Sequence, residues 1–284
     1  MQRKIIHIVG TGTIGEPLIG LLCDYQKQLG IDEVTFSHAV EFIGDFKQGS
    51  FILGKTDPKS VVFIDNRKIR VSNDGFFAFG LDRDRKNNVL IKIKNKNETK
   101  VIEKKVFKRK YKIQRIDGLP PKQVTPPPEV FDRIKRDNKL IGKARAIDSK
   151  LVFFKDKFIY PIDKYIITGV YGSQRILNGK PRRPHYGIDF HAPEGTPVRA
   201  MMDGEVTLVE KDMYFTGGTL IFDHGHGIST LFMHMKDINV KLGQKVKKGE
   251  IVGTLGQSGR ATGPHLDIRL NWFEVKLDPQ TILK

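Results

Sequence analysis

The chain has 284 residues, 49 lysines and arginines against 32 acidic residues, and a formal net charge of +17. One cysteine excludes an internal disulfide, and no stretch reaches the roughly 18 apolar residues that a membrane span requires, so we expect no integral membrane segment. The positive charge favours a polyanionic partner such as a cell wall, although lysines on the solvated face of strands would give the same charge. We expect no nucleic-acid partner, because no nucleic-acid-binding motif accompanies the charge.

The pattern of residues 1–38 predicts a strand, a glycine loop, a helix and a second strand. Gly10, Gly12 and Gly15 form a GxGxxG motif, as at the opening of a dinucleotide-binding unit. The segment resembles the start of an archaeal-type glyceraldehyde-3-phosphate dehydrogenase. One such unit cannot build a Rossmann sheet, which needs roughly 150 further residues. We therefore expect an isolated, non-functional βαβ fragment that stands where an export signal is normally found; no signal peptide is recognisable.

Two segments separate this fragment from the C-terminal part of the chain. Residues 39–117 contain short apolar runs such as SVVFID, FFAFGL and VLIKIK between turn residues, which predicts a small antiparallel β-sandwich of immunoglobulin-like character. Residues 118–150 begin with the proline-rich GLPPKQVTPPPEV, a semi-rigid linker. Apolar residues at helical spacing then predict one amphipathic helix between Glu129 and Ser149.

Residues 151–284 hold few helical periods and many β runs, among them TLIFD, ISTLFMH and HLDIRL. The segment also contains HYGID, in which His185 and Asp189 supply an imidazole and a carboxylate four residues apart. Two further candidates are His234, in LFMHM, and His265, in TGPHLD. Zinc hydrolases need a few such ligands on rigid segments and an open position for water. The His185 and Asp189 spacing alone is weak evidence, because chance matches are common.

The order of these motifs, together with the turn glycines between them, closely resembles the lysostaphin-like (LytM-type) zinc metallopeptidases, a family of peptidoglycan endopeptidases. The resemblance covers about residues 160–280. It implies a β-rich peptidase domain at residues 151–284 within a mainly β chain, with Zn²⁺ as the cofactor. It also implies that His185 and Asp189 bind the metal, while His234 and His265 act as catalytic histidines near the bound water and the scissile carbonyl.

The third ligand position departs from the family pattern, because Asp267 stands where the family has histidine. Aspartate binds zinc at nearly the same distance as histidine, so we expect the metal to be retained. Two carboxylates donate two negative charges rather than one, and Zn²⁺ would then polarise a water molecule less. His191 is an alternative third ligand: in a strand it would point to the same side as Asp189. The alternative interpretation is that His191 is an exposed residue at the rim of the substrate groove.

These residues predict a zinc-dependent endopeptidase that hydrolyses the peptide cross-links of bacterial peptidoglycan. Tyr171 and Arg175 are candidates for its groove, although Tyr171 equally fits core packing. The alternative is a noncatalytic cell-wall-binding adaptor that activates another peptidoglycan hydrolase. The resemblance implies a periplasmic or cell-envelope location, with the peptidoglycan peptide as substrate and a cell-envelope protein as a possible partner.

Overall fold

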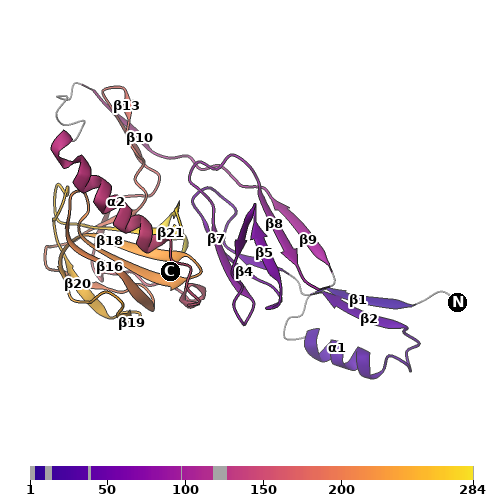
Figure 1. Cartoon of the computed structure of the whole chain (residues 1–284). Helices are drawn as coiled ribbons and strands as arrows, with labels where there is room; N and C mark the ends of the chain where they lie inside the picture. The colour runs from indigo at the N-terminus through magenta and orange to yellow at the C-terminus, as the bar shows by residue number, and fades with distance from the viewer. Residues whose placement is uncertain (1–3, 10–14, 38–39, 97, 118–126, 284) are drawn as a thin grey trace.

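The computed structural model describes residues 4–9, 15–37, 40–96, 98–117 and 127–283. Strands dominate these residues and most of them pair antiparallel, so the predicted mainly β fold class is confirmed. Figure 1 shows an elongated molecule in which strand-rich bodies follow one another from the N-terminus to the large C-terminal sheet. Among the described residues, none of the helices has the length and the apolar character needed to cross a membrane.

The first body is a single βαβ unit. Strand β1 (Ile5–Val9), helix α1 (Gly15–Asp24) and strand β2 (Glu33–Ser37) follow one another, and the two strands pair in parallel. Their sheet contains only these two strands among the described residues. Gly10 and Gly12 of the GxGxxG motif lie outside the described residues. The unit protrudes from one end of the molecule (Figure 1). That it lacks a function stays a prediction.

Two antiparallel sheets form the second body, where a β-sandwich was expected. The buried residues of both sheets belong to one hydrophobic core. Strand β8 shows why its sequence forms such a strand: Val89, Ile91 and Ile93 are buried, while Leu90 and Lys94 between and after them are exposed. The three-stranded sheet consists of β3 (Glu41–Ile43), β4 (Phe51–Lys55) and β7 (Phe76–Gly80), and the four-stranded sheet of β6 (Arg67–Ile69), β5 (Val61–Ile64), β8 (Val89–Lys94) and β9 (Thr99–Lys104).

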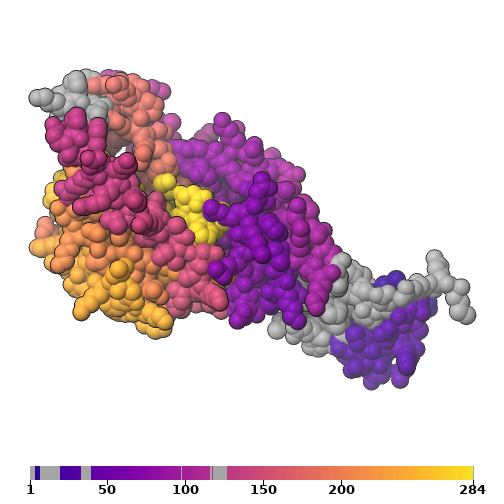
Figure 2. Space-filling model, viewed as in Figure 1, coloured from indigo at the N-terminus to yellow at the C-terminus, as the bar shows by residue number. Residues whose placement is uncertain are grey.

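This second body packs against the C-terminal part of the chain. Leu277 contacts Gly80 so closely that a side chain at the glycine would collide with it. Arg109 forms an ion pair of 2.7 Å with Asp278, whose side chain is only 3% exposed. Figure 2 shows the yellow C-terminal residues between the purple second body and the orange sheet. The hydrophobic core is therefore continuous between the two bodies, and the predicted domain boundaries stay predictions.

Helix α2 (Phe131–Arg145) lies inside the segment predicted to be an amphipathic helix. The short 3₁₀ turn η2 (Pro128–Val130) precedes it, and a second, η3 (Phe153–Lys155), follows it. Ala144 and its neighbours Leu140 and Ile141 pack on apolar side chains of the C-terminal sheet. The buried carboxylate of Asp137 accepts a hydrogen bond of 2.8 Å from the backbone N–H of Tyr214. The helix is thereby fixed on the sheet, across which it lies in Figure 1.

The C-terminal body is built on a ten-stranded sheet whose main path runs β11-β14-β21-β18-β17-β16-β19, with every pair antiparallel. A small sheet, β10-β12-β13, lies beside it. The large sheet comprises β11 (Ile166–Gly169), β14 (Ile188–His191), β15 (Pro197–Arg199), β16 (Gly204–Met213), β17 (Gly217–Gly225), β18 (Ile228–Ile238), β19 (Lys245–Val246), β20 (Ile251–Leu255), β21 (Leu266–Trp272) and β22 (Val275–Leu277). The small sheet comprises β10 (Ile113–Ile116), β12 (Gln174–Leu177) and β13 (Lys180–Pro181), and the turn η4 (Pro279–Thr281) ends the chain's regular structure.

Strand β21 divides its side chains between the two faces of this sheet. Leu266, Ile268 and Leu270 are fully buried in the main core. Asp267 and Arg269 alternate with them and therefore point to the opposite face. Helix α2 packs on that same face, because Leu231 and Met233, which pair with Arg269 and Asp267, belong to the helix-contacting cluster. The face carries both the helix and the polar residues of the candidate site.

Candidate metal centre

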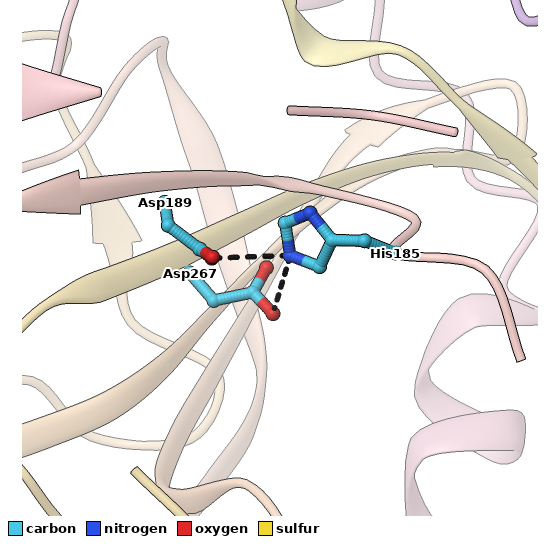
Figure 3. A group of neighbouring side chains, drawn as sticks. All are labelled: His185, Asp189 and Asp267. Carbon is cyan, nitrogen blue, oxygen red and sulfur yellow. Dashed lines mark hydrogen bonds and ion pairs between the residues drawn. The ribbon is translucent and has the colours of Figure 1, made fainter. Parts of the chain in front are cut away.

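Three side chains with metal-binding atoms meet on the polar face of the sheet. Asp189 of β14 and Asp267 of β21 are direct partners across the antiparallel pair, and His185 reaches them from the loop before β14. Figure 3 shows the three side chains pointing toward one another. Their ligand atoms all lie within 4.8 Å of one another, and they form the one group of three such residues found in the described part of the chain. The strand pairing therefore joins residues that stand 78 positions apart.

The positions of these three side chains are fixed by their surroundings. His185 Nδ1 lies 3.3 Å from the carbonyl oxygen of Val170, which leaves Nε2 facing the carboxylates. Nε2 is 3.1 Å from Asp189 Oδ1 and 3.4 Å from Asp267 Oδ2. A side chain at Gly169 would collide with the carboxylate of Asp189, and one at Gly187 with that of Asp267. Both glycines thus give the carboxylates room.

The electrostatics of this group suit a cation. Burial lowers the pKa of His185, but hydrogen bonding to Asp189 and Asp267 outweighs it and raises the pKa to about 10. Burial raises the pKa of Asp267, yet Arg269 and His185 hold it well below its usual range. Asp189 Oδ1 is buried and accepts no hydrogen bond of good geometry from the described residues. A proton on His185 therefore takes the place that a metal ion would fill, and the donor set fits such an ion.

Arg269 is a member of this site that the sequence argument missed. Its guanidinium group donates to Asp267, with Nη2 3.0 Å from Oδ2 and Nε 3.4 Å from Oδ1. The signal was present in the sequence, because residues two apart in a strand share a face. The positive charge of Arg269 offsets the additional negative charge that Asp267 brings to the ligand set.

His234 and His265 form a pair beside the metal group. Their rings lie 4.6 Å apart between centroids. Nδ1 of His234 contacts the carbonyl oxygen of Ser258 and Nδ1 of His265 that of Gly263, each at 2.8 Å. Both rings therefore keep Nε2 for other partners. Burial lowers the pKa of His234, and the nearby charges of Asp267 and Asp189 act in the opposite direction. His234 is thus neutral at pH 7 and lies within electrostatic reach of the metal group.

The structure places the remaining candidates further from this group. His191 is exposed, and its Nδ1 lies 2.7 Å from the carbonyl oxygen of Pro264. It is not among the clustered ligand atoms, in contrast to Asp267. Tyr171 is buried and its hydroxyl donates to the carbonyl of Lys276, so it packs in the core. Arg175 lies on the wall of the groove next to the metal group.

That groove has a volume of about 1170 Å³ and contains His185 and Asp189 in its lining. One wall comes from α2, through Ile134 and Ile141, and another from strands β10 and β12. Leu231 and Met233 of β18 also line it. The groove is large enough for a peptide segment and brings it to the metal ligands.

Comparisons with known proteins agree with this geometry. Residues 183–279 match the model of peptidase family M23. Peptidoglycan DD-endopeptidase ShyA of Vibrio cholerae is 39% identical over 113 residues, which are 39% of this chain and 26% of that protein. An uncharacterized metalloprotease of Buchnera aphidicola is 31% identical over 201 residues, 69% of this chain and 48% of that protein. The chain therefore spans about a quarter to a half of the length of these relatives.

One solved structure shares the fold over most of the molecule. The crystal structure of a putative M23 peptidase from Pseudomonas aeruginosa superposes with a TM-score of 0.63 at 24% identity. The match covers 86% of this chain and 92% of that one. It extends well beyond residues 183–279, so the arrangement of the second body beside the C-terminal sheet is part of the shared fold.

Proposed function

We propose that the protein is a zinc-dependent endopeptidase, because its residues 183–279 match the model of peptidase family M23. Its substrate is the peptide part of bacterial peptidoglycan, and the reaction is hydrolysis of the cross-links. The observation that carries the proposal is the meeting of His185, Asp189 and Asp267 at a groove that can hold a peptide. The relative named as a peptidoglycan DD-endopeptidase supports the same substrate.

His185, Asp189 and Asp267 would hold Zn²⁺, with one nitrogen and two carboxylate oxygens as donors. Three protein ligands leave a coordination position open, as in catalytic rather than structural zinc sites. When bound, Zn²⁺ supplies Lewis-acid chemistry by polarising the scissile carbonyl and the attacking water. Arg269 keeps Asp267 ionised, so this carboxylate stays in the form that binds a metal.

The histidine pair would move the protons of the reaction. Because Nδ1 of each ring is held by a backbone carbonyl, Nε2 is the atom of His234 and of His265 that is free to exchange a proton. One of them orients and deprotonates the attacking water at Nε2. The other donates a hydrogen bond to the developing oxyanion or a proton to the departing amine. The geometry supports both assignments of these two roles equally.

This activity belongs to the periplasm or the cell envelope, where its substrate lies. The proposal is tested on the full-length chain by measuring bound metal with mass spectrometry and by incubating it with purified peptidoglycan. We expect close to one zinc per chain and the release of un-cross-linked peptides. Binding to peptidoglycan without bound metal and without cleavage would contradict the proposal and favour the adaptor.

His234→Ala and His265→Ala provide the second test. Each variant should keep its zinc and its fold, because neither residue belongs to the ligand group. The cleavage rate should fall by roughly 10²- to 10⁴-fold, the usual contribution of a general acid or base. Zinc content, the circular dichroism spectrum and the initial rate are compared with wild type. An unchanged rate in either variant removes that histidine from the mechanism.

A further inference from the structure

Most of the charged residues that line the groove beside the candidate metal centre are cations. Eight of its lining side chains are lysine or arginine, and one, Asp189, is acidic. This ratio exceeds that of the whole sequence, which has 49 basic and 32 acidic residues. The cations come from helix, strand and loop segments that are distant in the sequence. The charge is thus a property of the groove and exceeds the general basicity of the chain.

These cations belong to two groups by their place in the chain. The first consists of Arg145 at the end of α2, Arg269 of β21 and Lys276 of β22. The second consists of Arg182 and Arg183, which follow β13 and stand three and two residues before His185. The loop that positions a metal ligand therefore also carries two guanidinium groups.

Most of these cations have no anionic partner in the protein. Arg269 is the exception, since it pairs with Asp267. Arg145 donates to the amide oxygen of Asn271 at 3.3 Å, and its buried Nε has no acceptor. Lys276 lies 5.0 Å from the ring centroid of Tyr186. Within the described parts of the chain, no carboxylate forms an ion pair with Arg145, Lys276, Arg182 or Arg183.

The cations of the first group, Arg145, Arg269 and Lys276, also repel one another. Burial lowers the pKa of Lys276, and the neighbouring Arg145 and Arg269 lower it further. Burial lowers the pKa of Arg145, and Arg269 adds to that effect. Like charges held together at low solvent exposure cost free energy, and a bound anion removes this cost. The groove is therefore arranged for a ligand with negative charge.

Apolar residues share the groove with the two cationic groups. Ile134 and Ile141 of α2, Ile167 of β11 and Leu231 and Met233 of β18 line the same groove. A small inorganic anion or a polysaccharide would leave this apolar surface uncovered. A peptide whose short aliphatic side chains alternate with carboxylates would cover it and meet both cationic groups.

We propose that the groove selects peptides with free carboxylates, one bound by Arg145 and Lys276 and a second by Arg182 and Arg183. This inference rests on the proposed function, because it names the substrate class of the same site. It states that cross-links whose carboxylates are free are cleaved, while those whose carboxylates are amidated are poor substrates.

The test uses two synthetic cross-linked peptides of the same sequence and the same scissile bond. One has free carboxylates and the other has them as amides. The full-length chain should cleave the first with a kcat/KM at least roughly tenfold higher, because charge-assisted hydrogen bonds to carboxylates are strong. The difference should appear mainly in KM. It should shrink as the salt concentration rises, because salt screens exposed charges.

Paired variants separate the groove from the general charge of the chain. Arg182→Gln with Arg183→Gln should lower the preference for the free-carboxylate peptide several-fold. Lys241→Gln with Lys245→Gln removes the same charge from exposed positions of this domain that do not line the groove, and should leave the preference unchanged. Melting temperatures of both double variants check the fold.

The outcomes distinguish the inference from the proposed function. Equal cleavage of the two peptides, or an equal loss of preference in both double variants, overturns the inference while the endopeptidase activity stands. If neither peptide is cleaved, the proposed function fails, and calorimetric binding of the same peptides to the wild-type chain decides the inference. Tighter binding of the free-carboxylate peptide then supports it, and equal binding overturns it.

Discussion

At the scale of single residues, Asp267 decides what the site can bind. It completes the ligand group, it pairs with Arg269, and it lies beside Gly187, where a larger residue would displace it. The carboxylate therefore has a place built for it in this chain, although it departs from the histidine expected at that position. A second negative charge near the metal is offset within the protein by one guanidinium group.

We expect Asp267→Ala to lose zinc, because it removes a direct ligand. The loss of affinity should exceed the roughly 10- to 100-fold that removal of an outer partner of a ligand costs. His191→Ala is the matched control and should keep its zinc, since His191 contacts Pro264 and lies outside the ligand group. Competition with a zinc-binding dye measures both affinities. The reverse result would make His191 the third ligand.

The raised pKa of His185 predicts how the stability of the metal-free protein depends on pH. Its pKa is raised from 6.5 to about 10 by the two carboxylates once burial has been overcome. A raised pKa in the folded state stabilises the protein fully below pH of about 6.5, and this stabilisation is lost as the pH rises through about 10. The melting temperature of the chelator-treated chain should therefore fall between these two pH values.

His185→Ala should lack this component of the pH dependence. Comparing the melting curves of the two proteins across the same pH range measures it, with buffers of equal ionic strength. Parallel pH profiles would show that His185 carries no raised pKa. Zinc affinity should rise over the same range in wild type, because the metal must displace the proton from His185.

At the scale of elements, α2 joins the metal-binding face to the apolar part of the sheet. The sequence predicts a helix between Glu129 and Ser149, and the structure has one from Phe131 to Arg145. Periodicity identifies an amphipathic helix, but it does not indicate which surface the apolar side covers. Here that surface is the face of the sheet that also holds Asp267, so the helix becomes a wall of the groove.

Asp137→Ala should loosen α2 from the sheet. The buried carboxylate accepts a hydrogen bond from Tyr214 N–H, in the connection between β16 and β17, and the alanine leaves that N–H without its partner. We expect a loss of about 1–3 kcal/mol in the free energy of unfolding. Lys139→Ala, at an exposed position of the same helix, is the control and should change it by less than about 0.5 kcal/mol. Urea denaturation measures both, and equal effects would contradict the assignment.

At the scale of the whole molecule, the second body and the C-terminal sheet form one packed unit. Their apolar residues share a core, and the ion pair between Arg109 and Asp278 crosses between them. The N-terminal βαβ unit differs, because among the residues whose side chains the structure describes, the buried cores begin at Phe51. The proline-rich sequence predicts a linker between the second body and the C-terminal part. The contacts that hold these two parts together are made by other residues.

Deletion of residues 1–38 should leave the melting temperature of the remaining chain and its peptidase rate unchanged. Of the deleted unit, none of the residues with a described side chain belongs to the buried cores or lines the groove. The full-length chain should also show no binding of NAD, because one βαβ unit supplies only part of a dinucleotide site. Differential scanning calorimetry and titration with NAD check these expectations. Micromolar affinity for NAD or aggregation of the shortened chain would contradict them.

The sequence by itself determined the β-rich class, through runs of period two, and the peptidase resemblance, through the motifs around His185, His234 and His265. Those signals are local, because a strand's periodicity and a short motif are written in adjacent residues. Three features came from the tertiary structure alone: Asp267 rather than His191 lies within reach of His185 and Asp189, Arg269 pairs with Asp267, and α2 lines the groove. Each of these depends on strand register and on contacts between residues far apart in the chain, which local patterns do not encode.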